Sequence, residues 1–252
     1  TGSGVFKFTS YSGVKKWSEV NSGLKNLNVW SLTISPNYAT DRTIFAGTDG
    51  GVFKSTERGE GWVEINTGLS SLHVWSLAIS PNYAVDQTIF AGTYEGEVFK
   101  SEDGGITWAI SNAGLNKSYV RSLAISPNYE TDQTIFSGTG AGIFKSTDGG
   151  ITWTSVNSGL TNLTVQSLAI SPDYAADETI FAGTLGGIFK STNGGTTWTS
   201  VNTGLKDLSV PSLAISPHYE ADQTLFAGTG IGVFKSNNGG STWRETTYTG
   251  VS

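Results

Sequence analysis

The sequence contains no cysteine and no methionine. The absence of cysteine excludes disulfides, thiolate nucleophiles, zinc–thiolate clusters and iron–sulfur ligation, so stability must come from packing and hydrogen bonds. Because Met is missing even at position 1, we expect a processed chain from which any signal peptide has been removed. No run approaches 18 consecutive apolar residues, so no membrane-spanning helix is predicted.

Charged residues are also scarce, at 14% of 252 residues, and acidic residues outnumber basic residues by 21 to 15. Affinity for nucleic acid depends on clustered cations, so DNA and RNA are not expected as partners. Glycine is abundant instead, with 33 residues. This composition is typical of short strands joined by many tight turns.

A repeat of about 45 residues runs through the chain. The segment Ser-Leu-x-Ile-Ser-Pro-x-Tyr recurs at spacings of 45, 46, 45 and 45 residues, beginning at Ser31, Ser76, Ser122, Ser167 and Ser212. Each copy continues into Asp-x-x-Thr-(Ile/Leu)-Phe-x-Gly-Thr and then into (Val/Ile)-Phe-Lys-Ser, and each reaches a Trp nine residues after that second Phe. A fixed period of this length decides the architecture.

Each repeat contains four short runs of β-branched and aromatic residues, separated by turn residues. In the fourth repeat these predicted strands, which we term A, B, C and D, cover residues 165–170, 179–184, 187–191 and 197–201. No stretch shows a sustained helical period. Four antiparallel strands in a unit of this size match a β-propeller blade, and stacking of blades would bury their faces. The sequence therefore predicts an all-β propeller of five blades, with six as the alternative.

The first 28 residues do not complete a repeat. Residues 5–20 look like one further C–D pair, with Phe8 and Trp17 at the nine-residue spacing. We therefore expect residues 1–28 to form a hairpin that closes or caps the ring, and residues 29–252 to form the propeller within one domain overall. Alternatively, the hairpin belongs to a sixth blade whose A and B strands lie outside this sequence.

The turn between strands C and D carries the most specific motif. Residues 101–108 and 146–153 both read Ser-x-Asp-x-Gly-x-Thr-Trp. This motif resembles the Asp-box, or bacterial neuraminidase repeat, of sialidases, xyloglucanases, sortilin-type receptors and photosystem II assembly factors. The resemblance implies a propeller fold but fixes no function. One reaction centre has no use for five copies of a turn, so we expect structural roles for Asp103, Asp148, Asn193, Asn238, Trp108, Trp153, Trp198 and Trp243.

Two other repeated polar positions have equally structural explanations. The Asp of each A–B connection is expected to accept a hydrogen bond in an Asx-type turn. The Lys of each Phe-Lys-Ser segment is expected to extend from strand C as a solvated stem, with its ammonium group in water and its methylene groups covering neighbouring side chains. These positions are Asp41, Asp86, Asp132, Asp177 and Asp222, and Lys54, Lys100, Lys145, Lys190 and Lys235.

Catalytic constellations are not found. A sialidase-like site needs three convergent Arg and a Tyr/Glu nucleophile pair, but the four Arg are dispersed over different kinds of segment. Glu95 and Glu97 form the one non-repeated acidic pair expected near the channel, and a solvated loop explains them. Two His, at positions 73 and 218, make no metal site. We therefore expect no catalytic residue, no metal and no cofactor.

Positions that differ between repeats are free of the packing constraint and are candidate recognition surface. The D–A and B–C connections vary most, and in propellers they share one face around the channel mouth. Aromatic platforms with a few polar groups suit sugars or exposed peptides. The alternative is that Trp30 and Trp75 fill the wedge between adjacent blades. The candidate ligand-binding residues are Trp30, His73, Trp75, Tyr94, Tyr119, Arg121 and Gln166.

These observations favour a secreted or cell-surface binding or scaffold module without catalytic activity. Its expected ligands are carbohydrate or protein surfaces at the channel-mouth loops, with neither nucleic acid nor membrane insertion. A glycoside hydrolase-like propeller is one alternative. A structural subunit of a cell-surface assembly, joined through blade edges or the spare hairpin, is the other.

Overall fold

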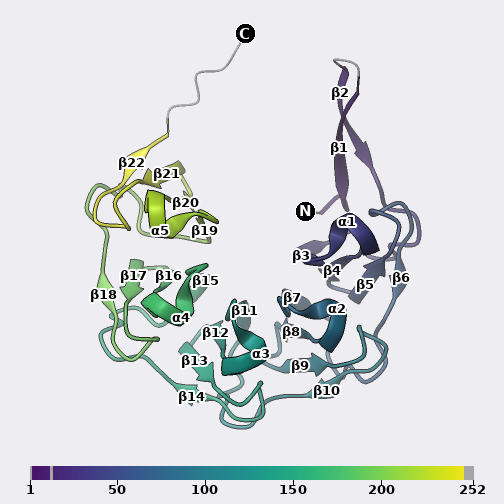
Figure 1. Cartoon of the computed structure of the whole chain (residues 1–252), viewed down its shortest axis with the longest axis horizontal. Helices are drawn as coiled ribbons and strands as arrows, with labels where there is room; N and C mark the ends of the chain where they lie inside the picture. The colour runs from purple at the N-terminus through teal and green to yellow at the C-terminus, as the bar shows by residue number, and fades with distance from the viewer. Residues whose placement is uncertain (1, 12–13, 247–252) are drawn as a thin grey trace. The chain divides into compact units, whose positions relative to one another are not determined.

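The computed structural model describes residues 2–11 and 14–246, which form β-strands and five single-turn helices (Figure 1). The described residues contain five four-stranded antiparallel sheets, here called blades 1 to 5, and one two-stranded sheet. The chain divides into two compact units. Unit 1 comprises residues 1–113 and 117–120, and unit 2 comprises residues 114–116 and 121–252.

Unit 1 holds the hairpin and the first two blades. The hairpin consists of β1 (Phe6–Tyr11) and β2 (Val14–Glu19). Blade 1 consists of β3 (Val29–Ile34), β4 (Ile44–Thr48), β5 (Gly51–Ser55) and β6 (Val63–Glu64). Blade 2 consists of β7 (Val74–Ile79), β8 (Ile89–Thr93), β9 (Val98–Ser101) and β10 (Ala109–Ile110). In both blades the strands pair in chain order, as the A–D prediction requires.

Unit 2 holds the other three blades, apart from the first residue of β11. Blade 3 consists of β11 (Val120–Ile125), β12 (Ile135–Thr139), β13 (Gly142–Ser146) and β14 (Thr154–Ser155). Blade 4 consists of β15 (Val165–Ile170), β16 (Ile180–Thr184), β17 (Gly187–Ser191) and β18 (Thr199–Ser200). Blade 5 consists of β19 (Ser212–Ile215), β20 (Leu225–Thr229), β21 (Gly232–Ser236) and β22 (Arg244–Glu245). The predicted strands are confirmed, although strand D is only two residues long.

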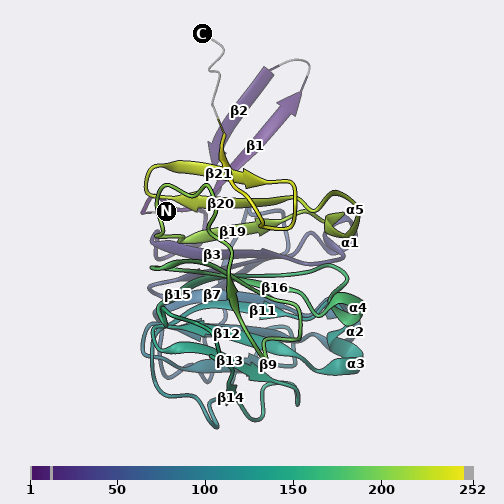
Figure 2. The ribbon, with the colours of Figure 1, turned by 90° about the vertical axis from the view of Figure 1, so that its left-hand side faces the viewer.

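The A–B connections contain short helices that the sequence did not predict. Each is a single turn at one end of its sheet (Figure 2), too short to show a helical period. The Asp that ends the turn accepts hydrogen bonds: in blade 2, Asp86 Oδ1 accepts the Thr88 N–H at 2.9 Å and Oδ2 accepts the Ser80 hydroxyl at 2.5 Å. The expected Asx-type turn is confirmed. The helices are α1 (Tyr38–Asp41), α2 (Tyr83–Asp86), α3 (Tyr129–Asp132), α4 (Tyr174–Asp177) and α5 (Tyr219–Asp222).

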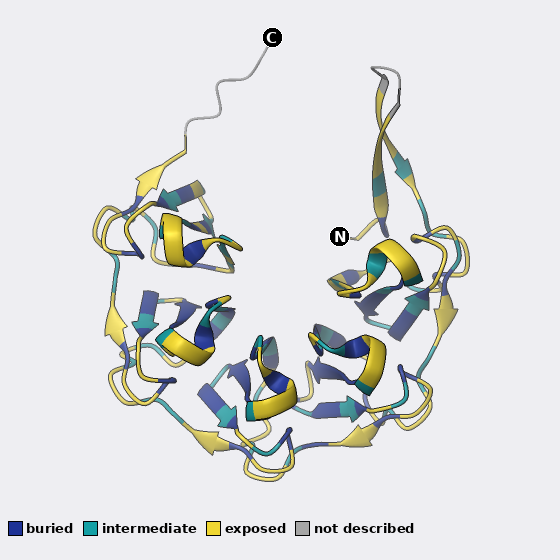
Figure 3. Cartoon of the chain, viewed as in Figure 1, coloured by how far each residue is buried: buried dark blue, intermediate teal, exposed yellow. Residues whose placement is uncertain are grey.

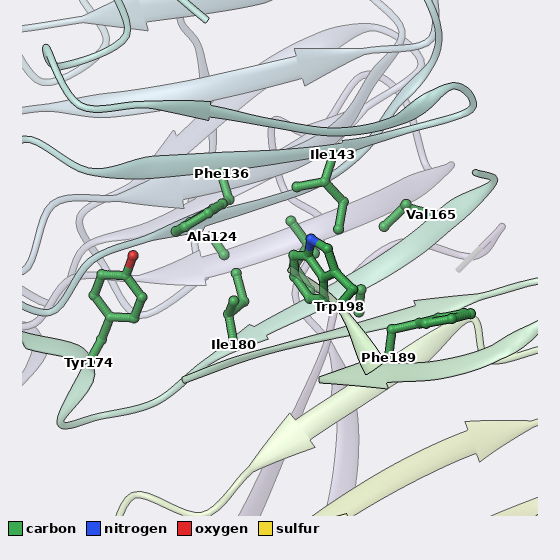
Figure 4. Close-up of a cluster of buried hydrophobic side chains, with 10 residues drawn as sticks. Ala124, Phe136, Ile143, Val165, Tyr174, Ile180, Phe189 and Trp198 are labelled. Carbon is green, nitrogen blue, oxygen red and sulfur yellow. The ribbon is translucent and has the colours of Figure 1, made fainter. Parts of the chain in front are cut away.

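The core lies between adjacent blades of the same unit. Phe136 and Ile143 of blade 3 pack against Val165, Phe189 and Trp198 of blade 4 (Figure 4). The side chains of Phe136, Ile143 and Val165 are fully buried. Figure 3 shows that the inner strands of the blades are largely buried, whereas the two-residue D strands and the single-turn helices are mostly exposed. Burial by stacking follows from the repeat, because one blade alone leaves both faces of its sheet in water.

A tryptophan anchors each of these contacts through the backbone of the preceding repeat. Trp198 is 4% exposed, and its Nε1–H donates to the carbonyl of Val156 at 2.8 Å. Its backbone N–H donates to the carbonyl of Ser158. Gly159 has a φ of +92°, and a Cβ there would lie 2.1 Å from the Trp198 carbonyl oxygen, so only glycine fits. Trp62, Trp108 and Trp243 bond the preceding repeat in the same way.

The C–D turn is held together by its acidic residue. Asp148 Oδ1 accepts the Ser146 hydroxyl at 2.7 Å and the Thr152 N–H at 2.9 Å, while Oδ2 accepts the Thr152 hydroxyl at 2.5 Å. Asn193 makes the same two bonds through Oδ1 and donates from Nδ2 to Thr197 Oγ1 at 2.9 Å. These contacts support a structural role, and they explain why either Asp or Asn serves at this position.

Three of the strand C lysines are not the solvated stems that the sequence suggested. Lys54 Nζ donates to the Gly104 carbonyl in the next blade at 3.1 Å and lies 5.4 Å from the centroid of the Phe45 ring. Partial burial lowers the pKa of Lys54, although the charges of Asp41 and Asp103 oppose this. Lys145 and Lys190 reach the next blade through equivalent bonds. Their stems and ammonium groups therefore join neighbouring blades.

The two strands of the hairpin pair as a C–D pair does, but the predicted alignment of Phe8 with the repeated Phe of strand C was wrong. Phe6 pairs with Glu19 and Lys7 with Ser18, as Phe144 and Lys145 of β13 pair with β14. Phe6, not Phe8, is therefore the counterpart of the repeated Phe, and two extra residues separate it from Trp17. Trp17 is 65% exposed and contacts Phe8, with ring centroids 5.3 Å apart. Closure or capping of the ring by residues 1–28 stays a prediction.

We expect Trp198→Ala to destabilise the protein by about 3 to 5 kcal/mol, because it removes a buried ring and an interblade hydrogen bond. Trp17→Ala is the matched control, and its exposed ring should contribute less than about 1.5 kcal/mol. Chemical denaturation of both variants measures the difference. Equal losses would show that burial does not govern the repeated tryptophans.

We expect Asp148→Ala to cost about 1 to 2 kcal/mol, whereas Asp148→Asn costs less, since Asn193 makes the same turn. The hydrogen bonds from Thr152 and Ser146 lower the pKa of Asp148 to about 2. A depressed pKa means that its stabilising contribution is present above about pH 4 and is lost as the pH falls towards 2. Denaturation midpoints between pH 5 and 2 should therefore fall less steeply in Asp148→Asn than in the wild type. Parallel curves would contradict the assignment.

Candidate functional site

Four exposed or half-buried aromatic rings gather on unit 1. Trp30 lies on β3 and Trp75 on β7, Tyr94 lies in the turn between β8 and β9, and Tyr119 precedes β11. The exposed fractions of Trp30, Tyr94 and Tyr119 are 57%, 40% and 42%. Trp75 is half-buried between them. The prediction named all four, and the structure brings them together.

A β-bulge turns the two tryptophans away from the core. The pairing of β3 with β4 shifts register between Val29 and Ser31, and Trp30 is the residue skipped. The same shift between Val74 and Ser76 skips Trp75. A bulged residue is left out of the ladder and its side chain is re-aimed. Val29 and Val74 remain buried, so the Trp that follows each Val is free of the packing constraint.

The rings contact one another in a continuous cluster. Trp30 and Trp75 have centroids 5.9 Å apart at an interplanar angle of 49°. Trp75 meets Tyr94 edge-on at 4.7 Å, and Tyr94 stacks on Tyr119 at 4.5 Å. His73 meets the Tyr94 ring edge-on at 6.2 Å. These five residues form what we call the aromatic surface.

Two carboxylates that the sequence did not single out as ligand-binding lie beside these rings. Asp49 accepts the indole N–H of Trp30 at 2.6 Å and the side-chain amide of Asn28 at 2.9 Å. Glu95 lies 2.6 Å from His73 Nδ1 and also accepts the Ser71 hydroxyl. Both carboxylates come from B–C connections. The variation of these connections between repeats was the sequence signal that could have added Asp49 and Glu95 to the candidate ligand-binding residues.

A depression of about 220 Å³ opens among these residues. It is lined by Trp30, Asp49, His73, Trp75 and Tyr94. Three aromatic rings, one carboxylate and one imidazole therefore surround a space large enough for a single sugar ring or amino-acid side chain. The lining contains no Lys or Arg.

The hydrogen bond between His73 and Glu95 shifts the pKa values of both side chains. The hydrogen bond to Glu95 raises the pKa of His73 above its ordinary value of 6.5, and the charges of Glu95 and Asp49 add to the rise. Burial acts to raise the pKa of Glu95, but the hydrogen bonds from Ser71 and His73 outweigh it, so that pKa lies below its ordinary value. Both shifts favour the ionised forms of the two side chains relative to their ordinary values.

The other two predicted ligand-binding residues belong to unit 2. Arg121 follows the first residue of β11 and is half-buried. Gln166 occupies the bulge of β15, where Oε1 accepts the Ser209 hydroxyl at 3.4 Å. Their part in a shared site with the aromatic surface stays a prediction.

Metal and membrane features were searched in the part of the chain that the structure describes. It contains no group of three or more His, Asp or Glu side chains placed to hold a metal ion. None of its helices has the length and hydropathy needed to cross a bilayer.

Comparison with known proteins identifies the fold. No protein-family model matches the sequence, and no curated protein matches it. Solved structures do match, and they are β-propellers: an ancestral GH74 enzyme has a TM-score of 0.71 at 24% identity over 89% of this chain, which spans 31% of that enzyme. The extracellular domain of BT4673 from B. thetaiotaomicron has a TM-score of 0.72 at 18% identity, over 99% of this chain and 31% of that chain.

A further match is YCF48 bound to D1 peptide, with a TM-score of 0.66 at 17% identity, over 97% of this chain and 75% of that chain. At these identities the matches show the fold alone. The chain is thus an all-β protein of the β-propeller fold, as the repeat predicted, and it spans about a third of the GH74 enzyme that it resembles. With five four-stranded blades and a hairpin that corresponds to strands C and D of another, the structure fits the six-blade alternative.

We expect His73 to titrate above pH 6.5 in an NMR titration and to move back towards 6.5 in Glu95→Gln. Because the pKa is raised in the folded state, the stability that the pair contributes is present below about pH 6.5 and is lost as the pH rises through the pKa of His73. The chain has two His, so His73→Gln assigns the signal. A pKa that Glu95→Gln leaves unchanged would remove Glu95 as the cause.

Proposed function

We propose that the chain is an Asp-box propeller that acts as a non-catalytic binding module, with its ligand on the aromatic surface. One observation carries the proposal. Four rings lie together at positions that differ between repeats, and the bulges of β3 and β7 present two of them outside the core. Exposed, clustered rings are typical of sites that stack on sugars or anchor peptide side chains.

The charges around the rings narrow the class of ligand. Asp49 and Glu95 are acidic, and no Lys or Arg lines the depression. A uronic or sialic acid would meet like charge there, and neutral sugars or peptides without acidic side chains would not. We therefore propose a neutral saccharide or an exposed peptide segment as the ligand.

The structural neighbours are compatible with this proposal. YCF48 is a propeller bound to a peptide, and BT4673 contributes an extracellular domain of the same fold. The latter supports a secreted or cell-surface location for this chain, as the sequence favoured. The repeated Ser-x-Asp turn and its hydrogen bonds support membership of the Asp-box class.

A larger depression in unit 2 is a weaker candidate. It measures about 470 Å³ and is lined by Lys235, Asn238, Arg244 and neighbouring polar residues of blade 5. Its lining contains no aromatic ring. Open polar depressions of this kind bury little apolar ligand surface, so they supply less binding energy than a ring-lined site of smaller volume.

A glycoside hydrolase is the second candidate function. Two carboxylates, Asp49 and Glu95, lie beside rings suited to a sugar, and a GH74 enzyme is among the structural neighbours. Hydrolysis of a glycosidic bond requires one carboxyl to act as acid and the other as base or nucleophile. In this chain both carboxylates are engaged by hydrogen bonds within the protein, which favours recognition over turnover.

We expect Trp30→Ala to weaken ligand binding at least tenfold, a loss of about 1.4 kcal/mol, while leaving stability nearly unchanged because the ring is more than half exposed. A panel of neutral and acidic oligosaccharides and unstructured peptides identifies the ligand, and titration calorimetry measures its affinity. Trp17→Ala is the matched control, since it removes an exposed Trp far along the hairpin.

Three outcomes decide between the candidate functions. Saturable binding that Trp30→Ala abolishes and Trp17→Ala retains supports the binding module. Release of reducing sugar that Asp49→Asn or Glu95→Gln abolishes would replace it with the hydrolase. Binding that both Trp variants retain would place the ligand elsewhere and refute the site.

A further inference from the structure

One backbone edge in unit 1 has no strand beside it. Among the described residues β1 pairs only with β2, whereas the counterpart strands β5 and β9 each lie between two others. Val5 donates its N–H to Asn21 and accepts the N–H of Val20, so its polar groups point towards β2. Polar groups of successive residues alternate between the two edges of a strand. Those of Phe6 and Phe8 therefore point to the outer edge.

The same part of unit 1 leaves apolar side chains of blade 1 uncovered. Leu32 and Ile34 of β3 are 50% and 54% exposed. The counterpart of Leu32 in blade 2, Leu77, is 8% exposed, and the counterpart of Ile34, Ile79, is partly buried, because blade 1 covers them. Tyr38 is likewise half-buried, whereas Tyr83 in the same position of blade 2 is 3% exposed.

Unit 2 shows what covers these positions when a complete blade precedes them. Blade 4 covers blade 5 with Ala169 of strand A, Phe181 of strand B and Ile188 of strand C. In unit 1 the hairpin supplies Val5, which corresponds to Ile188 and packs against Val29 and Phe53 of blade 1. The described residues of unit 1 contain no counterpart of Ala169 or Phe181 on this face.

The hairpin also makes the polar contact of a preceding blade. Lys7 Nζ donates to Glu60 in the C–D turn of blade 1 at 2.9 Å, as Lys54 donates to Gly104 in the turn of blade 2. The Val20 carbonyl accepts the indole N–H of Trp62 at 2.7 Å. The hairpin is therefore seated on blade 1 as strands C and D are, and the uncovered face continues this existing contact.

We propose that the outer edge of β1, together with Leu32, Ile34 and Tyr38, is a docking site for a β-hairpin of the strand A–strand B pattern of this repeat, carried by a partner chain. The partner strand adds to β1 and its Phe covers Leu32 and Ile34. Strand addition of this kind gains affinity from main-chain hydrogen bonds and specificity from alternate side chains. The site is independent of the aromatic surface and of the function proposed for it.

The internal repeat also fixes the register of the docked strand. In blade 4, Gly183 pairs with Ile188, Ala182 with Phe189 and Phe181 with Lys190. Replacing β17 by β1 places the partner's Gly beside Val5, its Ala beside Phe6 and its Phe beside Lys7. A register shifted by one residue would turn the Phe away from Leu32.

The test uses the full chain and a fluorescent peptide with the sequence of residues 164–185, with a scrambled peptide as reference. We expect saturable binding by fluorescence anisotropy, and slowed hydrogen exchange at the amides of Phe6 and Phe8. Leu32→Arg should weaken binding at least tenfold. Phe8→Pro should do the same, because proline removes an outward N–H while the bonds to β2 remain.

Ile106→Arg is the matched control, because Ile106 is a 69% exposed apolar residue of the same unit outside this face. It should leave the affinity unchanged, and thermal melts confirm that all three variants fold. The absence of saturable binding, or equal weakening by Ile106→Arg, overturns the proposal. A concentration-dependent dimer of the chain that saturating peptide does not displace would assign the face to a second copy and also overturn it.

Discussion

Within each unit the structure depends on the bond between a buried indole and the backbone of the preceding repeat. The Trp Nε1–H donates to a carbonyl that lies about 42 or 43 residues earlier, as from Trp198 to Val156 and from Trp108 to Ile65. A buried polar group without a partner would cost the full desolvation penalty, so ring and carbonyl must be placed together. Gly159, which directly precedes Leu160, lets the backbone approach the Trp198 carbonyl, which explains why the repeat keeps both the glycine and the tryptophan. The single repeat is thus structurally incomplete, and the contact between repeats is the unit of stability.

The candidate site uses the positions that this constraint leaves free. The residue after the buried Val of strand A falls in a bulge and is left out of the strand pairing, and the repeats place Trp30, Trp75 and Gln166 there. The B–C turns next to it contribute Asp49 and Glu95, which hold ring and imidazole orientations through hydrogen bonds. Scaffold and candidate site are therefore built from the same repeat, and a change at the site need not disturb the interblade bond.

The repeat made most of the fold predictable. Strands A to C of the fourth repeat, the Asx-type turns and the structural part of Asp148 and Asn193 followed from period and residue type, because identical segments in identical environments must pack alike. The single-turn helices were missed because four residues cannot show a period. The role of Lys54 was missed because its partner is a backbone carbonyl 50 residues away, which no local pattern reports. For the aromatic surface, variation between repeats indicated which positions to choose. The pairing of His73 with Glu95 required knowledge of which two connections lie side by side.

The hairpin shows how small a departure from the repeat changes the local outcome. Its two extra residues lengthen both strands, so Trp17 lies within β2 and pairs with Phe8, whereas the Trp of each blade precedes strand D. No preceding repeat in the described chain offers Trp17 a carbonyl, and its ring is exposed where the other indoles of this position are buried. Yet the segment after Trp17 keeps the repeat. Gly23 and Leu24 contact blade 1 as their counterparts contact the next blade. Asn21 accepts the Val5 N–H within the hairpin, as Asn202 accepts the Ile188 N–H within blade 4. The contact of the hairpin with blade 1 therefore combines Val5 and Lys7 of β1 with the residues that follow β2, and it forms without a buried indole in the hairpin.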